Sequence, residues 1–268
     1  MKKHLMFAEK SCRYDKGCTA CQGTCPKGAL SFDEEGKPQP DWKVCASCET
    51  FDCTKLCPNN AMKKCGTEHT VKSLMEILKR DSAGWGIDGG VTLSGGEPLL
   101  HHDFLMEFLP ECRKNHMHTA IETSAYAQEN IFMDVFQYLN FAFIDVKNMD
   151  PEAHKWGTGV DNARTLSNIR TLVRSGWKGR LVLRQPTIGG YNDSIENAEK
   201  LIAFMKELDL FEINLLKFHR LGASKWQQLG KPYEFMDHGD VTQERLEELQ
   251  SLYLENQIAC YIGDDTPF

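Results

Sequence analysis

The hydrophobic residues after position 67 switch repeatedly between two spacings. Short apolar runs typical of strands are followed by segments whose apolar residues recur every three to four positions, as in helices. The predicted strands are 91–94, 118–124, 141–148, 180–186, 211–219 and 259–263. The predicted helices are 70–81, 104–115, 129–139, 163–176, 194–208 and 242–257. This strict alternation predicts an α/β fold with a parallel sheet and crossover helices.

The cysteines are concentrated in the first quarter of the chain. Nine of the eleven lie between Cys12 and Cys65, and only Cys112 and Cys260 follow. This shift in composition predicts a domain boundary near Thr67. We therefore expect a cysteine-rich domain over 1–66 and the α/β domain over 67–268.

Eight of these cysteines form two groups of four, and each group ends in Cys-Pro. The groups are Cys12-x5-Cys18-x2-Cys21-x3-Cys25 and Cys45-x2-Cys48-x4-Cys53-x3-Cys57. This is the bacterial ferredoxin pattern in duplicate, with one gap lengthened in each half. In two-cluster ferredoxins the fourth cysteine of each group binds the other cluster. The pattern thus predicts one [4Fe–4S] cluster on Cys12, Cys18, Cys21 and Cys57, and a second on Cys45, Cys48, Cys53 and Cys25.

Composition favours metal ligands over disulfides for these cysteines. The first residues contain no apolar secretory segment, and no run approaches the roughly 18 apolar residues of a membrane helix. We therefore expect a cytoplasmic protein, away from membranes, with reduced thiols. Zinc is the alternative, but the doubled Cys-Pro groups fit iron–sulfur better. The net charge of −7 argues against nucleic acid as the main partner. We expect Cys65, Cys112 and Cys260 to be small buried hydrophobic residues.

Polar residues lie at the ends of five successive predicted strands. The C-terminal strand ends of a parallel sheet carry its chemistry. Each residue also has an ordinary explanation: a Gly-Pro turn, a local Asp145–Lys147 pair, a surface arginine, or a core histidine. Polar residues at the ends of five successive strands together indicate a functional site. The candidates are Gly95, Gly96, Glu97, Glu122, Thr123, Asp145, Lys147, Arg184 and His219.

These motifs together resemble the radical S-adenosylmethionine (SAM) superfamily, specifically the activating enzymes of glycyl radical enzymes. The resemblance extends over the double ferredoxin segment, SGGEP, IET, IDVK, LRQP and LLKFHRLGASKWQQLG. It implies a partial (β/α)6 TIM-like barrel behind a ferredoxin-like double [4Fe–4S] segment. It also implies reductive cleavage of SAM to a 5′-deoxyadenosyl radical, which installs a glycyl radical on a partner glycyl radical enzyme. Flavodoxin or ferredoxin would be the reductant.

The resemblance also implies a role for each candidate. Gly95, Gly96 and Glu97 would receive the SAM amino group. Asp145 and Lys147 would lie beside SAM, with Glu122 and Thr123 near them. Arg184 and His219 would contact its carboxylate and ribose. Lys147 and His219 are the candidates for a catalytic role.

The chain departs from the family in one respect: its 268 residues contain no Cys-x3-Cys-x2-Cys. In the family this loop follows a first barrel strand, ahead of the ferredoxin segment, and binds the catalytic [4Fe–4S] cluster. We therefore expect the first strand to be missing and this chain to hold two auxiliary clusters, with a third only if the N-terminal segment is present. As written, the chain would be inactive. The alternatives are a ferredoxin-like electron carrier or scaffold, and another radical SAM enzyme acting on a small molecule or peptide.

Overall fold

The computed structural model describes residues 4–86, 89–263 and 265–266, which form two compact units. The first unit is Met1–Glu68 with His219–Asp237. The second is His69–Phe218 with His238–Phe268. No periodicity in the sequence indicated that the segment 219–237 belongs with the cysteine-rich part of the chain.

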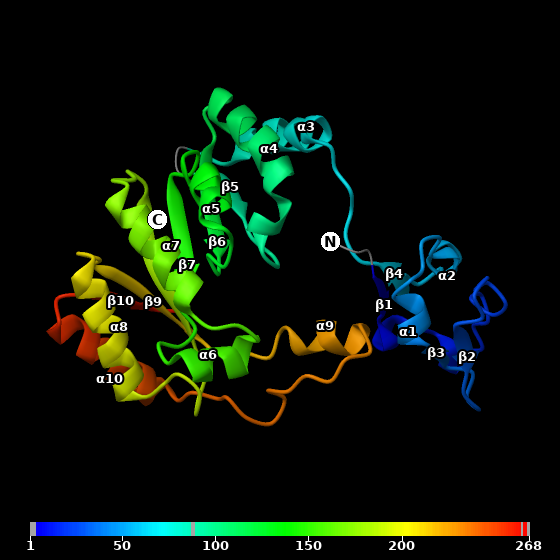
Figure 1. Cartoon of the computed structure of the whole chain (residues 1–268). Coiled ribbons are helices and arrows are strands. Elements are labelled where there is room, and N and C mark those ends of the chain that lie inside the picture. The colour runs from blue at the N-terminus through cyan, green and yellow to red at the C-terminus, as the bar shows by residue number, and fades with distance from the viewer. Residues whose placement is uncertain (1–3, 87–88, 264, 267–268) are drawn as a thin grey trace. The chain divides into compact units, whose positions relative to one another are not determined.

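The second unit is built on one parallel sheet, coloured cyan-green to red in Figure 1. Its strands are β5 (Gly90–Leu93), β6 (His118–Thr123), β7 (Phe141–Asp145), β8 (Arg180–Thr187), β9 (Glu212–Lys217) and β10 (Ala259–Ile262). They pair in the order β10-β9-β8-β7-β6-β5, and every pairing is parallel. The six predicted strands and the parallel sheet are confirmed.

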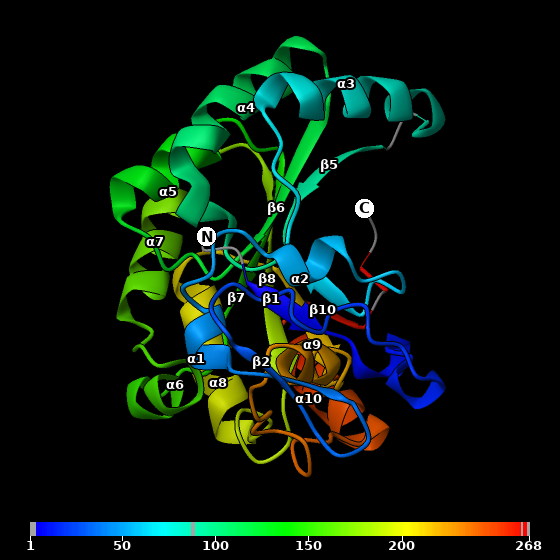
Figure 2. The same cartoon turned by 90° about the vertical axis from the view of Figure 1, so that its right-hand side faces the viewer.

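Helices connect the strands of this sheet. They are α3 (Val71–Asp81), α4 (His102–Lys114), α5 (Glu129–Phe136), α6 (Pro151–Thr158), α7 (Ala163–Arg174), α8 (Ile195–Glu207) and α10 (Gln243–Glu255). Figure 2 shows α4, α5, α7 and α8 following one another in an arc along one side of the sheet. Side chains of Thr70, Ser194 and Thr242 accept backbone N–H bonds at the starts of α3, α8 and α10. The six predicted helices are confirmed, and α6 is additional.

The two faces of the sheet carry different residues. On β7, Ala142 and Ile144 belong to the large apolar core that the helices cover. Phe141 and Phe143 belong to a separate small cluster with Val182. Since side chains alternate along a strand, Asp145 continues the Phe141 and Phe143 face. The site candidates at this strand end therefore lie on the face away from the main core.

The first unit contains little regular structure. Its elements are β1 (Leu5–Phe7), β2 (Leu30–Phe32), β3 (Pro38–Pro40), α1 (Trp42–Cys45), α2 (Asp52–Lys55), β4 (Met62–Lys64) and α9 (Ala223–Gln228). Strand β1 pairs antiparallel with β4, and β2 with β3. The apolar core consists of Leu5, Phe7, Phe51, Ala61 and Met62, and several cysteines pack against it. A core of this size is small for a folding unit, which is typical of domains that rely on metal or disulfide cross-links.

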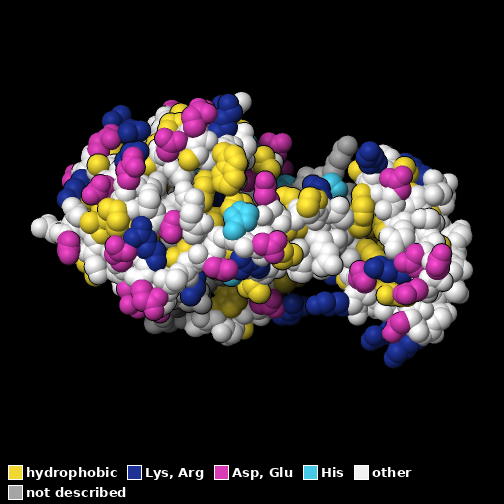
Figure 3. All heavy atoms as spheres, turned by 90° about the horizontal axis from the view of Figure 1, so that it is seen from below, with side chains coloured by type: hydrophobic (Ala, Val, Ile, Leu, Met, Phe, Trp, Pro, Cys, Tyr) yellow, Lys and Arg dark blue, Asp and Glu magenta, His cyan; other side chains and the backbone are white. Residues whose placement is uncertain are grey.

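Charged side chains of both signs are interspersed over the face shown in Figure 3. Within the described part of the chain, no helix has the length and apolar character needed to cross a membrane.

Candidate functional site

Four cysteines from distant parts of the first unit line one small cavity. They are Cys12, Cys18, Cys21 and Cys57. Burial raises the pKa of Cys21, and the neighbouring thiols of Cys12, Cys57 and Cys18 raise it further. The cavity therefore combines three cysteines of the first sequence group with the last cysteine of the second group.

The remaining four cysteines of the two groups are also neighbours. Burial raises the pKa of Cys53 to about 11, with further contributions from Cys45, Cys25 and Cys48. The pKa of Cys45 is raised by burial and then by Cys25 and Cys48. This set is again crossed, with Cys25 of the first group among three cysteines of the second.

Backbone N–H groups point at three of these sulfur atoms. Ala29 donates to Cys25 Sγ at 3.3 Å, and Phe51 donates to Cys48 Sγ at 3.4 Å. The N–H of Met62 lies 3.4 Å from Cys57 Sγ. Such bonds stabilise the charge of cluster-bound thiolates. All eight thiols are free. In the described residues no three His, Cys, Asp or Glu side chains gather closely enough for a single metal ion.

The three isolated cysteines lie outside both sets. Cys112 and Cys260 are buried in the main core, where burial raises their pKa to about 11 and about 12. Cys65 is exposed.

The SGGEP segment follows β5 and has an unusual backbone. Gly95 and Gly96 have φ of 75° and 81°, a left-handed conformation that side chains other than glycine rarely adopt. Both residues are exposed, and nothing lies within 4 Å of a Cβ built on Gly95. The positive φ angle favours glycine at position 95. Crowding is not the reason, because a Cβ there would meet no neighbouring atom. The turn leaves its backbone groups accessible to a ligand.

Glu97 is held by four hydrogen bonds within the protein. Its Oε1 accepts from the Thr123 hydroxyl at 2.6 Å and from the Leu99 N–H at 3.1 Å. Its Oε2 accepts from the Ser124 hydroxyl at 2.6 Å and the Ser124 N–H at 2.9 Å. A carboxylate offers about four acceptor positions, so Glu97 is saturated in this arrangement. It links the glycine turn after β5 to the end of β6.

Asp145, the last residue of β7, lies between two cations: Lys147 just beyond β7, and Arg184, which lies within β8 and not at its end as the sequence predicted. Its Oδ2 accepts from Lys147 Nζ at 2.7 Å, and its Oδ1 accepts from Arg184 Nε at 2.7 Å. Burial raises the pKa of Asp145, but the charges of Lys147 and Arg184 outweigh this effect and leave the pKa below its usual value. Arg184 also lies 3.3 Å from a carboxylate oxygen of Glu122 and stacks over Phe143. Residues of three neighbouring strands, β6, β7 and β8, thus share one network of charges.

The structure places the other candidates as follows. Thr123 is buried, and its hydroxyl donates to Glu97 and accepts from the Ala125 N–H. Lys147 is partly exposed beside Asp145. His219 begins the segment 219–237, which belongs to the first unit.

Two residues of this site were missed by sequence reasoning. Ser124 follows the predicted IET motif but was not recognised as a partner of Glu97. Asn192 is fully buried, and its Nδ2 donates to the carbonyls of Lys147 at 2.6 Å and Pro186 at 2.8 Å. The only sequence signal for Asn192 was its position before a helix start, which is also typical of an ordinary turn.

Comparison with known proteins gives the family. The profile of the radical SAM superfamily matches residues 50–204. The 4-hydroxyphenylacetate decarboxylase activating enzyme of Clostridium scatologenes is 59% identical over 267 residues, which cover 100% of this chain and 86% of that protein. The enzyme of the same name from Clostridioides difficile (strain CD196) is 53% identical, covering 100% and 85%. The chain belongs to the radical SAM activating enzymes of glycyl radical enzymes.

A solved structure agrees with this family. The activating enzyme matches a domain of the pyruvate-formate lyase-activating enzyme from Bacteroides vulgatus ATCC 8482 with a TM-score of 0.55 and 27% identity. The match covers 65% of this chain and 99% of that domain. Membership implies a [4Fe–4S] cluster and SAM as cofactors.

Proposed function

We propose that this activating enzyme installs the glycyl radical of a 4-hydroxyphenylacetate decarboxylase. The observation that carries the proposal is the 59% and 53% identity, over the whole chain, to two activating enzymes of that name. When bound, SAM and its cluster supply a 5′-deoxyadenosyl radical, which takes a hydrogen atom from the partner's glycine.

The proposal includes two auxiliary [4Fe–4S] clusters in a ferredoxin-like segment. The donor set fits them, because eight thiols form two sets of four with N–H groups directed at three sulfurs. In this proposal one cluster is held by Cys12, Cys18, Cys21 and Cys57. The other is held by Cys25, Cys45, Cys48 and Cys53. Their role is to pass electrons toward the catalytic cluster, with flavodoxin or ferredoxin as the source.

The residues of the sheet position SAM in this proposal. The accessible backbone of Gly95 and Gly96 receives its amino group, while Glu97 fixes the turn to β6. Lys147 is held in place by Asp145, and Arg184 presents its guanidinium above Phe143. For His219, which begins the segment of the first unit, only the family resemblance supports a contact with SAM. A partial (β/α)6 barrel is supported by the parallel sheet and the arc of helices beside it.

The catalytic cluster requires three further cysteines in a Cys-x3-Cys-x2-Cys loop, which these 268 residues do not include. We therefore expect activity only when such a segment is supplied. A ferredoxin-like carrier without radical chemistry is the second candidate, but no observation favours it over the activase.

The test uses protein that is expressed and purified anaerobically with a Cys-x3-Cys-x2-Cys loop included. It is mixed with SAM, a reductant and a 4-hydroxyphenylacetate decarboxylase, and the glycyl radical is measured by electron paramagnetic resonance. We expect a doublet signal that needs all three additions. Reducible clusters without SAM cleavage would instead favour the electron-carrier alternative.

A further inference from the structure

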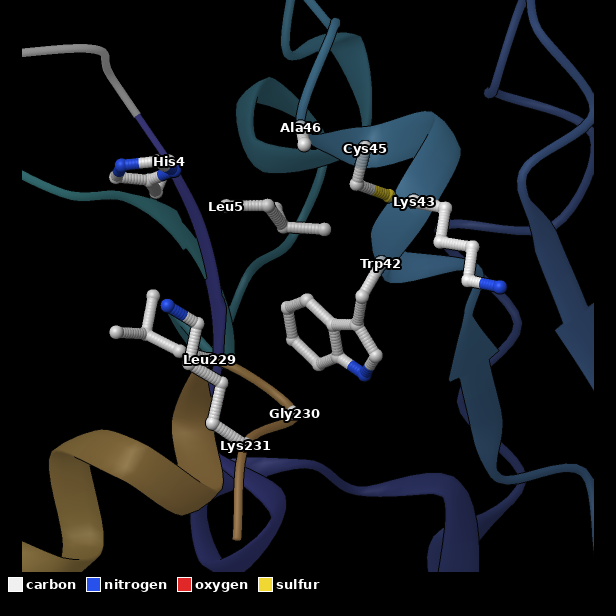
Figure 4. A pocket seen from close by; sticks show the side chains of 9 residues that line it. All are labelled: His4, Leu5, Trp42, Lys43, Cys45, Ala46, Leu229, Gly230 and Lys231. Atoms are coloured by element: carbon white, nitrogen blue, oxygen red, sulfur yellow. The ribbon is translucent and has the colours of Figure 1, made fainter.

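A cavity of about 360 Å³ opens in the first unit beside the second set of cysteines. Figure 4 shows the indole of Trp42 extending from α1 toward the turn at Leu229 and Gly230. A Cβ on Gly230 would collide with the Trp42 indole, so the turn packs directly against this ring. Leu5 completes a largely apolar floor.

The wall of this cavity includes Cys45, one of the four neighbouring thiols Cys25, Cys45, Cys48 and Cys53. A redox group seated in the cavity would therefore lie against a cysteine of this set. Electrons tunnel efficiently over such short separations, and the cavity gives an external donor its access to the set.

The charged residues that line the cavity are all basic. They are Lys43 and Lys231, both exposed, and none of the lining residues is acidic. Neither lysine has an ion-pair partner among the described residues. Lys231 Nζ lies 5.7 Å from the ring centre of Trp226, which is 45% exposed. The cavity thus has an apolar, aromatic floor and a positive rim.

The charges of the two units also favour the first unit as the place where an acidic protein binds. The first unit carries 14 Lys and Arg against 11 Asp and Glu, whereas the second carries 17 against 27. An acidic protein is repelled by the second unit and attracted to the basic rim, which directs its encounter.

We propose that this cavity is the docking site of a small acidic protein that carries one electron at a time. Electrons then enter through the cluster of Cys25, Cys45, Cys48 and Cys53, an assignment that rests on the proposed function. In the transfer the carrier loses one electron, the cluster passes from its 2+ to its 1+ level, and no bond forms or breaks. Redox partners use small interfaces, so a cavity with a charged rim is sufficient.

The test compares two double variants that change the charge equally within the first unit. K43E/K231E reverses the rim, and K10E/K16E is the control. Stopped-flow absorption follows cluster reduction by reduced flavodoxin at low ionic strength. We expect K43E/K231E to lower the second-order rate at least about ten-fold, with the difference shrinking at high salt. The control should stay within about two-fold.

Photoreduced 5-deazariboflavin, a small uncharged donor, checks that the clusters of each variant are intact. It should reduce both variants and the unsubstituted protein at equal rates. Unchanged flavodoxin rates in K43E/K231E, or a larger loss in K10E/K16E, would overturn the docking site. Unsubstituted protein that holds no reducible cluster would refute the proposed function instead.

Discussion

Asp145 forms both a local ion pair and a larger network with residues of neighbouring strands. The spacing of Asp145 and Lys147 allowed either a local pair or a functional site. In the structure the pair forms, and Arg184 and Glu122 join it from neighbouring strands. Parallel pairing places Arg184 directly opposite Asp145, a register that the sequence could not give.

Replacing Asp145 by asparagine should destabilise the second unit by about 3 kcal/mol, because two cations would lose their buried counter-charge. Its folded-state pKa lies below the unfolded value near 4. The stabilisation is therefore complete above the unfolded pKa and is lost as pH falls through the folded pKa. Urea unfolding of both proteins between about pH 2 and pH 7 measures both effects, and the variant should lose part of the acid dependence.

Glu196→Gln is the matched control, since Glu196 forms an exposed ion pair with Lys200. Exposed pairs contribute little, so this change should cost less than about 1 kcal/mol. Equal losses in the two variants would contradict a special role for the Asp145 network.

Ser124→Ala removes one donor from the saturated carboxylate of Glu97. Hydrogen bonds to charged groups contribute about 1.5–3 kcal/mol, and we expect a loss of that order in urea unfolding. Ser251→Ala serves as control, because among the described residues the exposed hydroxyl of Ser251 bonds only to a carbonyl of its own helix. A Ser124 variant as stable as the Ser251 variant would show that the link between the glycine turn and β6 is unimportant.

Helices and strands could be predicted from the sequence where their burial requires a regular pattern of apolar residues. The run Phe141–Ile144 is buried throughout, as expected for a parallel strand with both faces covered. Two short helices had no such pattern. Helix α6 buries only His154, and α9 buries only Ala223. Without an apolar stripe, neither α6 nor α9 was among the helices predicted from the sequence.

The loop between β8 and α8 is held by buried amides. Besides its bonds to Lys147 and Pro186, Asn192 accepts the Ile188 N–H at 2.7 Å through its Oδ1. Asn197 Nδ2 in turn donates to the Asn192 carbonyl. This network fixes the backbone that carries Lys147.

Asn192→Ala should therefore lower the free energy of unfolding by about 2–4 kcal/mol, because several buried groups lose their partners. Asn115→Ala is the comparison, since Asn115 Nδ2 bonds only to the carbonyl of Glu111 one turn earlier. We expect less than about 1 kcal/mol there. Urea unfolding in parallel measures the difference, and similar losses would argue against a bracing network around Asn192.

At the scale of the whole molecule, the sequence indicated the parallel sheet and the contrast between a cysteine-rich part and an α/β part. It could not indicate that 219–237 belongs to the first unit, because long-range packing leaves no local period. The cysteine ligand sets could be predicted from the sequence only with the help of the ferredoxin rule. Spacing alone allows each group of four to bind its own cluster, whereas the ferredoxin rule crosses the fourth cysteines.

Two double variants distinguish these ligand assignments. Cys12 and Cys57 line the same cavity, so C12A/C57A should remove a single cluster. In C12A/C25A the two cysteines belong to different sets, and both clusters should be lost. Relative to the unsubstituted protein, iron analysis after anaerobic reconstitution should show losses of about four and about eight iron atoms per chain. Uncrossed binding gives the reverse order, about eight irons lost in C12A/C57A and about four in C12A/C25A. Since each variant lacks two cysteines, non-specific loss of binding would affect both equally, and only the order of the losses identifies the ligands.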